Sequence, residues 1–200
     1  MVAIIDYGMG NVASVQKALN FLKIESVITN DREQIEKADQ LILPGVGSFL
    51  QGMKNLQSKG LDVLLTNEVV NKKKRFLGIC LGMQLLAEKG TEPHENVGLG
   101  WIKGKVERIE NIPLRVPHMG WNTVDVKINT FYKDVDHKDF YFIHSYHFVP
   151  DSKSVIAATT NYSIEIVASL QQENIFATQF HPEKSQEAGL TVLRNFFINA

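Results

Sequence analysis

The chain has 200 residues, of which 44% are hydrophobic and 22% charged, as expected of one globular domain over residues 1–200. Its formal net charge of −1 provides no general attraction for nucleic acid or an anionic membrane. No segment approaches the roughly 18 apolar residues of a membrane span, and the amino-terminal segment reaches Asp6 too early for a signal peptide. We therefore expect a cytoplasmic protein with no nucleic-acid or membrane partner.

The first half of the chain alternates short apolar runs with helical patterns. The runs predicted to be buried strands are Val2–Ile5, Ser26–Thr29, Leu41–Leu43 and Phe76–Ile79. Between the first two, residues Asn11–Leu22 place apolar side chains at three- and four-residue steps, which predicts a helix with one apolar face. Alternating strands and helices indicate a parallel sheet.

The second half is predicted to contain consecutive strands joined by short polar links. These strands are Lys105–Ile109, Asn122–Val126, Phe140–Ile143, Ile166–Leu170 and Ile175–Thr178. A tight turn is expected at Gln171–Asn174 and a closing helix at Gln186–Ala200. Because strands with short connections are antiparallel, we predict an α/β fold whose central sheet is mixed but mostly parallel, with helices on the faces of its parallel part.

Cys80 is the only cysteine of the chain, so neither an internal disulfide nor a cysteine-cluster metal site is possible. Burial as a small apolar side chain is the default explanation. However, Gly78 and Gly82 flank Cys80 where a predicted strand turns into a helix ending near Gly90. This pattern is the thiol counterpart of the nucleophile elbow. A helix beginning at Cys80 would favour the thiolate, which is the reactive form.

His181 is the best-placed base for Cys80 among the six histidines, because it follows a predicted strand and Glu183 follows two residues later. A carboxylate bonded to one ring nitrogen fixes the tautomer and leaves the other nitrogen to accept the thiol proton. His-Pro-Glu is also compatible with an ordinary exposed turn. For His118, His144 and His147, packing or interface hydrogen bonding is favoured over catalysis or metal binding.

Pro44–Gly47 follows another predicted strand and offers backbone N–H groups for an oxyanion hole, although a simple corner would need the same residues. In an elbow, one donor is the N–H after the nucleophile, here that of Leu81. Gln84 lies one helical turn after Cys80, within reach of a substrate, unless it is a surface residue. All these segments lie at carboxyl ends of predicted strands, where open α/β sheets place their sites.

The Gly-x-Cys-x-Gly elbow followed by His-x-Glu resembles the class I glutamine amidotransferase family. The resemblance implies a three-layer, flavodoxin-like fold that needs no cofactor or metal. It also implies a triad of Cys80, His181 and Glu183 that forms a γ-glutamyl thioester, releases ammonia and yields glutamate. The oxyanion donors would be Val46 and Leu81. The residues implied to hold glutamine are Gly47, Gln84, Glu92, Ser145 and Tyr146, with Glu92 near the α-amino group.

Further motifs are similar to one branch of this family, the glutaminase subunits of imidazole glycerol phosphate synthase. These motifs are Ile5–Asn11, Pro44–Gly47, Pro117–Asn122 and Tyr141–Tyr146. The resemblance implies a heterodimer with a (β/α)8-barrel cyclase, which uses the ammonia to make imidazole glycerol phosphate and aminoimidazole carboxamide ribonucleotide for histidine biosynthesis. It places Asn11, Trp121 and Lys184 at the interface. Trp121 is equally compatible with the core, although Gly120 and Asn122 suggest an irregular surface segment.

Three alternatives remain at this point. A paralogous subunit would supply ammonia to another synthase, for example one that amidates a sugar for surface polysaccharide. A regulatory subunit would keep the fold without catalysis, although no member of the triad is missing. A cysteine peptidase or deglycase would share the elbow, but the spacing of His181 and Glu183 and the presence of Gln84 disfavour it.

Overall fold

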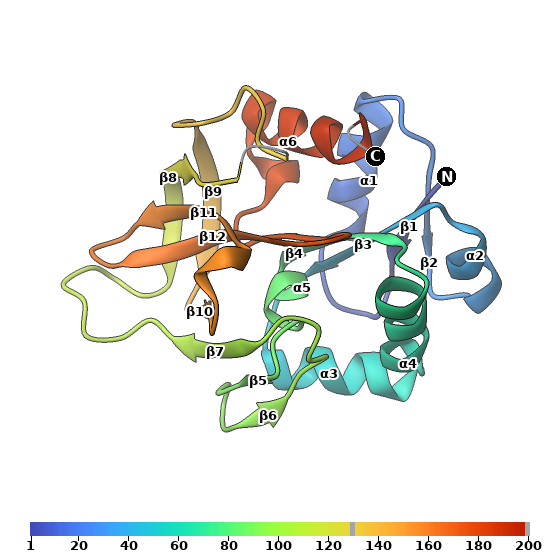
Figure 1. Ribbon diagram of the computed structural model, residues 1–200, viewed down its shortest axis with the longest axis horizontal. Helices are drawn as coiled ribbons and strands as arrows, with labels where there is room; N and C mark the ends of the chain where they lie inside the picture. Colours follow the sequence, from blue (N-terminus) through green and yellow to red (C-terminus); the bar gives the residue numbers. More distant parts are fainter. Residues whose placement is uncertain (129–130, 199–200) are drawn as a thin grey trace.

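The computed structural model describes residues 1–128 and 131–198 and arranges them in three layers, with a nine-stranded sheet between two sets of helices (Figure 1). In spatial order, its strands are β2 (Ser26–Thr29), β1 (Val2–Ile5), β3 (Gln40–Gly45), β4 (Arg75–Cys80), β13 (Ile175–Thr178), β12 (Glu165–Gln172), β11 (Ile156–Asn161), β8 (His118–Val126) and β9 (Asp139–His144). The four predicted strands of the first half and the last predicted strand all lie in the parallel part.

The sheet is mixed, as the sequence predicts, but it is not mostly parallel. In the described sheet, four neighbouring strand pairs are parallel and four are antiparallel. The order β2-β1-β3-β4-β13 is that of flavodoxin-like folds. Short connections such as the turn at Glu173, with φ of 50°, join β12 to β13 and force an antiparallel pair. The sequence analysis predicted too few strands for the antiparallel half of the sheet, because it missed β11.

Helices cover both faces of the sheet, each burying an apolar stripe (Figure 1). On one face lie α1 (Val12–Phe21) and α6 (Gln186–Ile198). On the other face lie α2 (Arg32–Lys37), α3 (Phe49–Ser58), α4 (Leu61–Thr66) and the π-helical turn η1 (Asn67–Asn71). The last two residues of the predicted closing helix, Asn199 and Ala200, lie outside the described residues. No helix in the described part of the chain is long and apolar enough to cross a membrane.

A second, four-stranded sheet packs beside the first. Its order is β10 (Tyr146–Pro150), β7 (Gly104–Arg108), β5 (Lys89–Gly90) and β6 (Asn96–Val97). There are also two 3-10 turns, η2 (Lys153–Val155) and η3 (Pro182–Lys184). Of this second sheet the sequence anticipated only β7. Strands of two residues, such as β5 and β6, carry no periodic signal, and the five-residue β10 was also missed.

The predicted helix from Cys80 to Gly90 is wrong in length. It is reduced to α5 (Leu81–Gln84), and Gly90 lies in strand β5. The carbonyls that would have continued the helix bond to a later segment instead. Leu85 O accepts from Leu99 N at 2.9 Å, and Leu86 O accepts from Trp101 N at 2.9 Å. Tertiary hydrogen bonds therefore replace the second and third helical turns.

Candidate active site

Cys80 lies at the carboxyl end of β4, beside Gly45 at the end of β3, and the chain reverses there into α5. Its φ of 54° and ψ of −107° are unusual for a residue with a side chain. Such a strained turn is what lifts a nucleophile above the sheet. The side chain is 6% exposed, and its Sγ lies 3.9 Å from the carbonyl oxygen of Ile143.

The two glycines around Cys80 are required by close backbone contacts. A Cβ on Gly82 would lie 1.8 Å from the carbonyl oxygen of Leu43, and a Cβ on Gly78 would lie 2.7 Å from the carbonyl oxygen of Gly82. Both distances are below any ordinary carbon–oxygen contact, and backbone cannot retreat as a flexible side chain can. The elbow therefore closes only with glycine at both positions.

His181 follows β13, and Glu183 orients it as the sequence predicts. Its Nδ1 lies 2.8 Å from Glu183 Oε1, and both side chains are 2% exposed. Nε2 of His181 is buried without a hydrogen-bond partner. Further bonds fix the segment, because His181 N donates to Tyr141 O at 2.9 Å and Ser185 Oγ donates to His181 O at 2.7 Å. Nδ1 is therefore committed to Glu183, and Nε2 is the nitrogen left for the thiol proton.

The electrostatic environment favours a protonated His181. Burial alone would lower the pKa of His181, but the charge of Cys80 and its hydrogen bond, together with the hydrogen bond and charge of Glu183, raise it to about 10. The imidazolium is thus stabilised by its two neighbours. An imidazolium beside the nucleophile suits catalysis in which His181 handles the proton of the thiol.

One cavity of about 380 Å³ opens over Cys80. Every residue expected to hold glutamine or the oxyanion lines it: Val46, Gly47, Leu81, Gln84, Glu92, Ser145 and Tyr146. They come from four separate parts of the chain, at the carboxyl ends of β3, β4 and β9 and in the loop after β5. Because Leu81 N begins α5, it has no partner within that helix and is available to an oxyanion.

Gln84 and Glu92 are held by hydrogen bonds at the wall of this cavity. Nε2 of Gln84 donates to Tyr146 O at 2.9 Å and to Gln179 Oε1 at 3.0 Å, so Gln84 is not a surface residue. Glu92 Oε2 accepts from the backbone N–H of Phe49 at 3.0 Å. This bond fixes a carboxylate where a cationic ligand group could approach it.

Comparisons with known proteins indicate the same class of enzyme as the site geometry does. The model of the family "Glutamine amidotransferase class-I" matches residues 3–200. The chain belongs to this family. Among its relatives, "Imidazole glycerol phosphate synthase subunit HisH 1" of Methanococcus maripaludis is 50% identical, with 98% of each chain covered. The protein of the same name from Campylobacter jejuni strain RM1221 is 47% identical, again over 98% of each chain.

Solved structures share the fold at much lower identity. One described as "Crystal structure of glutamine amidotransferase" has a TM-score of 0.78 and 22% identity, covering 100% of this chain and 98% of the other. A glutamine amidotransferase from Thermotoga maritima has a TM-score of 0.67 and 17% identity, with 98% of this chain and 81% of the other covered. Both establish the amidotransferase fold for this chain.

The residues expected at a partner interface lie at the surface of the amidotransferase. Trp121 is 46% exposed, which excludes the core. It lies inside β8 and pairs with Tyr141 of β9, so the expected irregular segment is a regular strand that begins at His118. Lys184 is exposed, lines the cavity and places its Nζ 5.9 Å from the Tyr141 ring. Asn11 is exposed but also caps α1 by accepting from Ser14 N.

The sequence analysis did not identify four residues as part of the amidotransferase site. Ser48, Ile143 and His144 line the cavity, and Gln179 Nε2 lies 3.7 Å from Cys80 Sγ. Ser48 carried a usable signal as the N-cap of α3, which fixes the loop after β3. Ile143 offers only a backbone carbonyl, which no sequence pattern reveals. His144 was expected to pack or hydrogen-bond, and it does both.

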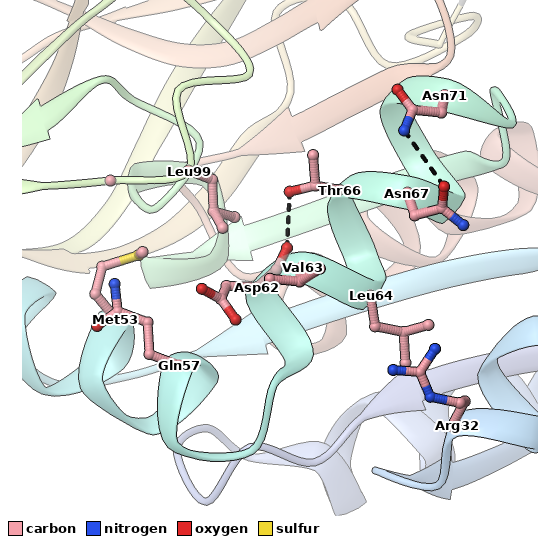
Figure 2. A pocket seen from close by; sticks show the side chains of 11 residues that line it. Arg32, Met53, Gln57, Asp62, Val63, Leu64, Thr66, Asn67, Asn71 and Leu99 are labelled. Carbon is pink, nitrogen blue, oxygen red and sulfur yellow. Dashed lines mark hydrogen bonds between the residues drawn. The ribbon is translucent and has the colours of Figure 1, made fainter.

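A larger cavity of about 520 Å³ lies away from Cys80, between α3, α4 and η1 (Figure 2). Arg32 and Met53 border it from opposite sides. Two of the polar side chains drawn there bond locally: Thr66 Oγ1 donates to Asp62 O at 2.7 Å, and Asn71 Nδ2 donates to Asn67 Oδ1 at 3.3 Å. None of the predicted site residues lines this cavity. Cavity size alone therefore does not locate the amidotransferase site.

Proposed function

We propose that this amidotransferase hydrolyses L-glutamine to glutamate and ammonia and transfers the ammonia to a separate synthase subunit. The observation that carries the proposal is the single cavity over Cys80, which is lined by all the expected oxyanion and glutamine residues. The pair formed by His181 and Glu183 supports the same chemistry, because it supplies an oriented base for the thiol. We also propose that the protein acts in the cytoplasm.

In the first half-reaction, Cys80 Sγ attacks the side-chain amide carbon of glutamine, and His181 holds the thiol proton. The carbonyl oxygen becomes an oxyanion, for which the N–H groups of Val46 and Leu81 are the donors. When this intermediate collapses, the C–N bond breaks and His181 donates its proton to the leaving nitrogen. The products are ammonia and a γ-glutamyl thioester on Cys80.

In the second half-reaction, His181 takes a proton from water as the water attacks the thioester carbon. Collapse of the second tetrahedral intermediate breaks the C–S bond and releases glutamate and the Cys80 thiolate. Gln84, Glu92, Ser145 and Tyr146 would hold the amino-acid end of glutamine, with Glu92 facing its ammonium group. No cofactor takes part in either half.

For the acceptor, we propose a (β/α)8-barrel cyclase that forms a heterodimer with this chain. It would use the ammonia to make imidazole glycerol phosphate and aminoimidazole carboxamide ribonucleotide in histidine biosynthesis. The names of the relatives favour this acceptor. A paralogous synthase that amidates a sugar is the second candidate. Co-purification with the chain, followed by mass spectrometry of the bound protein, would distinguish the two.

The chemistry is tested by measuring glutamate release from glutamine, with and without the cyclase and its acceptor substrate. Wild-type protein is expected to release glutamate, and Cys80→Ala is expected to reduce turnover by at least about a thousandfold because the covalent intermediate cannot form. Undiminished turnover in Cys80→Ala would exclude the mechanism.

Substrate class is tested by alkylating the single cysteine. Glutamine is expected to protect Cys80 from iodoacetamide, whereas peptides are expected to give no protection. Protection by peptides alone would instead favour a cysteine peptidase. A regulatory subunit without catalysis would release no glutamate even in the presence of the partner.

A further inference from the structure

A continuous series of polar contacts leads away from Cys80 beneath the cavity. Gln179 is fully buried, and its Nε2 lies 3.7 Å from Cys80 Sγ. Its Oε1 accepts from Gln84 Nε2 at 3.0 Å. The same Gln84 nitrogen donates to the carbonyl oxygen of Tyr146 at 2.9 Å. The nucleophile is thereby connected to the segment that would hold glutamine.

From Tyr146 the series continues through two buried histidines to the exposed hairpin formed by β8 and β9. Nδ1 of His144 lies 2.9 Å from Tyr146 O. Nε2 of His144 lies 3.0 Å from Nδ1 of His118, and Nε2 of His118 lies 2.8 Å from Asn122 Oδ1. Asn122 follows the exposed Trp121 in β8 and points to the opposite face of the strand, so the contacts end one residue from the surface expected to meet the partner.

The orientations of the two end groups are fixed. Tyr146 O is a carbonyl and can only accept. Asn122 presents its oxygen to His118 because its Nδ2 donates to Asn161 O at 3.1 Å on the other side. Turning this amide over would place two oxygens against each other. Both outer contacts of the histidine pair therefore require an N–H from the pair.

The pair has too few hydrogens for its contacts. Three contacts each need one hydrogen: His118 to Asn122, His144 to Tyr146, and the histidines to each other. Two neutral imidazoles carry only one N–H each. Satisfying all three would require an imidazolium in a site where His118 is fully buried and His144 is 6% exposed.

The surroundings disfavour that extra charge. Burial first, and then the charges of His118, His147 and His181, lower the pKa of His144 to about 3, against a smaller opposing effect of the bond to Tyr146 O. Burial also lowers the pKa of His118. Lys184, a further cation, lines the cavity beside His144. Burial therefore favours the neutral form of both rings, and in that form one of the three contacts lacks a hydrogen.

We propose that His118 and His144 are positioning residues that couple the β8–β9 hairpin to the glutamine pocket. The coupling is a change in which of their three contacts lacks a hydrogen. With the His144 hydrogen on Nδ1, Tyr146 O is held. With it on Nε2, His144 bonds to His118 and no longer holds Tyr146 O, which keeps its bond from Gln84. A partner that moves Asn122 away from His118 removes the acceptor at His118 Nε2, so the His118 hydrogen can move to Nδ1. His118 then donates to His144, whose own hydrogen holds Tyr146.

The inference rests on the proposed glutaminase function, and it is tested by the KM for glutamine with and without the cyclase. His118→Phe keeps a flat ring to stack on Tyr162, whose centroid lies 3.9 Å away, but removes both nitrogens. His144 then has no acceptor for an Nε2 hydrogen, so its hydrogen stays on Nδ1 and Tyr146 O stays held. The cyclase is expected to lower the KM of the wild type about tenfold and that of His118→Phe by less than about twofold. His118→Gln, which retains one donor and one acceptor, is expected to recover most of the cyclase effect.

His147→Phe is the matched control, because His147 is a buried histidine of β10 outside the series of contacts. The cyclase is expected to lower its KM as much as that of the wild type, at a similar change in melting temperature. A cyclase effect on KM that persists in His118→Phe, or that is lost equally in His147→Phe, would overturn the coupling. If wild-type protein released no glutamate, the proposed function itself would fail, which is a different result.

A spectroscopic measurement on otherwise native side chains covers the case in which His118→Phe does not fold. Histidine ring ¹H–¹⁵N spectra report which nitrogen carries the hydrogen. In Cys80→Ala, which cannot turn glutamine over, we expect the tautomer of His118 or His144 to change when glutamine or the cyclase binds. Identical ring spectra in the free and bound states would contradict the proposal.

Discussion

His181 lies between two acidic neighbours. Glu183 Oε1 lies 2.8 Å from its Nδ1, and Cys80 and Glu183 both raise the pKa of its imidazole, by charge and by hydrogen bonding. The protonation state of His181 is therefore set by its neighbours rather than by the residue type alone.

Glu183→Gln removes a negative charge that stabilises the His181 imidazolium. Because Glu183 is among the groups that raise the pKa of His181, the substitution is expected to lower that pKa. The alkaline limb of kcat/KM against pH should move to lower pH. At neutral pH, kcat/KM should fall about a hundredfold.

Glu187→Gln is the control for this prediction, because it removes an exposed carboxylate four residues further along the chain. Its pH profile is expected to match that of the wild type. An unmoved alkaline limb in Glu183→Gln would show that Glu183 does not act on His181.

At the scale of elements, the elbow between β4 and α5 works because glycines allow the chain to reverse against β3. The tightest approach is that of Gly82 to Leu43 O. The strain at Cys80 is maintained by the pairing of β4 with β3 on one side and β13 on the other. The short α5 contributes an N-terminal turn with free N–H groups rather than a long helix dipole.

Gly82→Ala is expected to destabilise the protein by about 3 kcal/mol, because a Cβ there would lie 1.8 Å from the carbonyl oxygen of Leu43. Urea unfolding followed by circular dichroism measures the loss. Gly52→Ala in α3 is the matched control: the three atoms nearest to its Cβ would be side-chain carbons of Leu81 and Leu85, at 3.2–3.3 Å. Its change should stay below about 1 kcal/mol. Equal losses in the two variants would contradict the role assigned to the elbow.

At the scale of the whole molecule, one face of the β8–β9 hairpin carries exposed apolar side chains beside the cavity. Met119 pairs with Ile143 and Trp121 pairs with Tyr141, which places all four on the same face. Met119 is 62% exposed and Trp121 46% exposed. An exposed apolar face of this kind is typical of protein–protein interfaces, and Lys184 adds a positive charge next to it.

Trp121→Ala is expected to weaken binding of the proposed cyclase about thirtyfold, because aromatic anchors contribute most to such interfaces. Calorimetric titration of the two proteins measures the change in Kd. Phe21→Ala is the control, since Phe21 is also an exposed aromatic residue but ends α1 at the opposite edge of the sheet. Unchanged affinity in Trp121→Ala, or an equal loss in both variants, would rule out the hairpin face as the docking surface.

Local sequence patterns determined several parts of the fold and of the candidate site. Apolar runs located the five strands of the parallel part, and the glycines around Cys80 identified the elbow. The family likeness then identified residues 3–200 as a class I glutamine amidotransferase. These signals are readable because they are local: an apolar strand, a two-residue glycine spacing and a His-x-Glu tripeptide each depend on near neighbours. That residues 1–200 form one domain remains a prediction.

The tertiary structure decided what depends on distant partners. It shortened the helix after Cys80, because carbonyls of residues 85 and 86 found donors in residues 99 and 101. It placed Trp121 at the surface and built the second sheet, in which two of the four strands have only two residues. It also connected His118 to His144 and Gln179 to Cys80, pairs that lie 26 and 99 residues apart. Such contacts depend on how folded segments meet in space, and no local pattern of residues encodes that meeting.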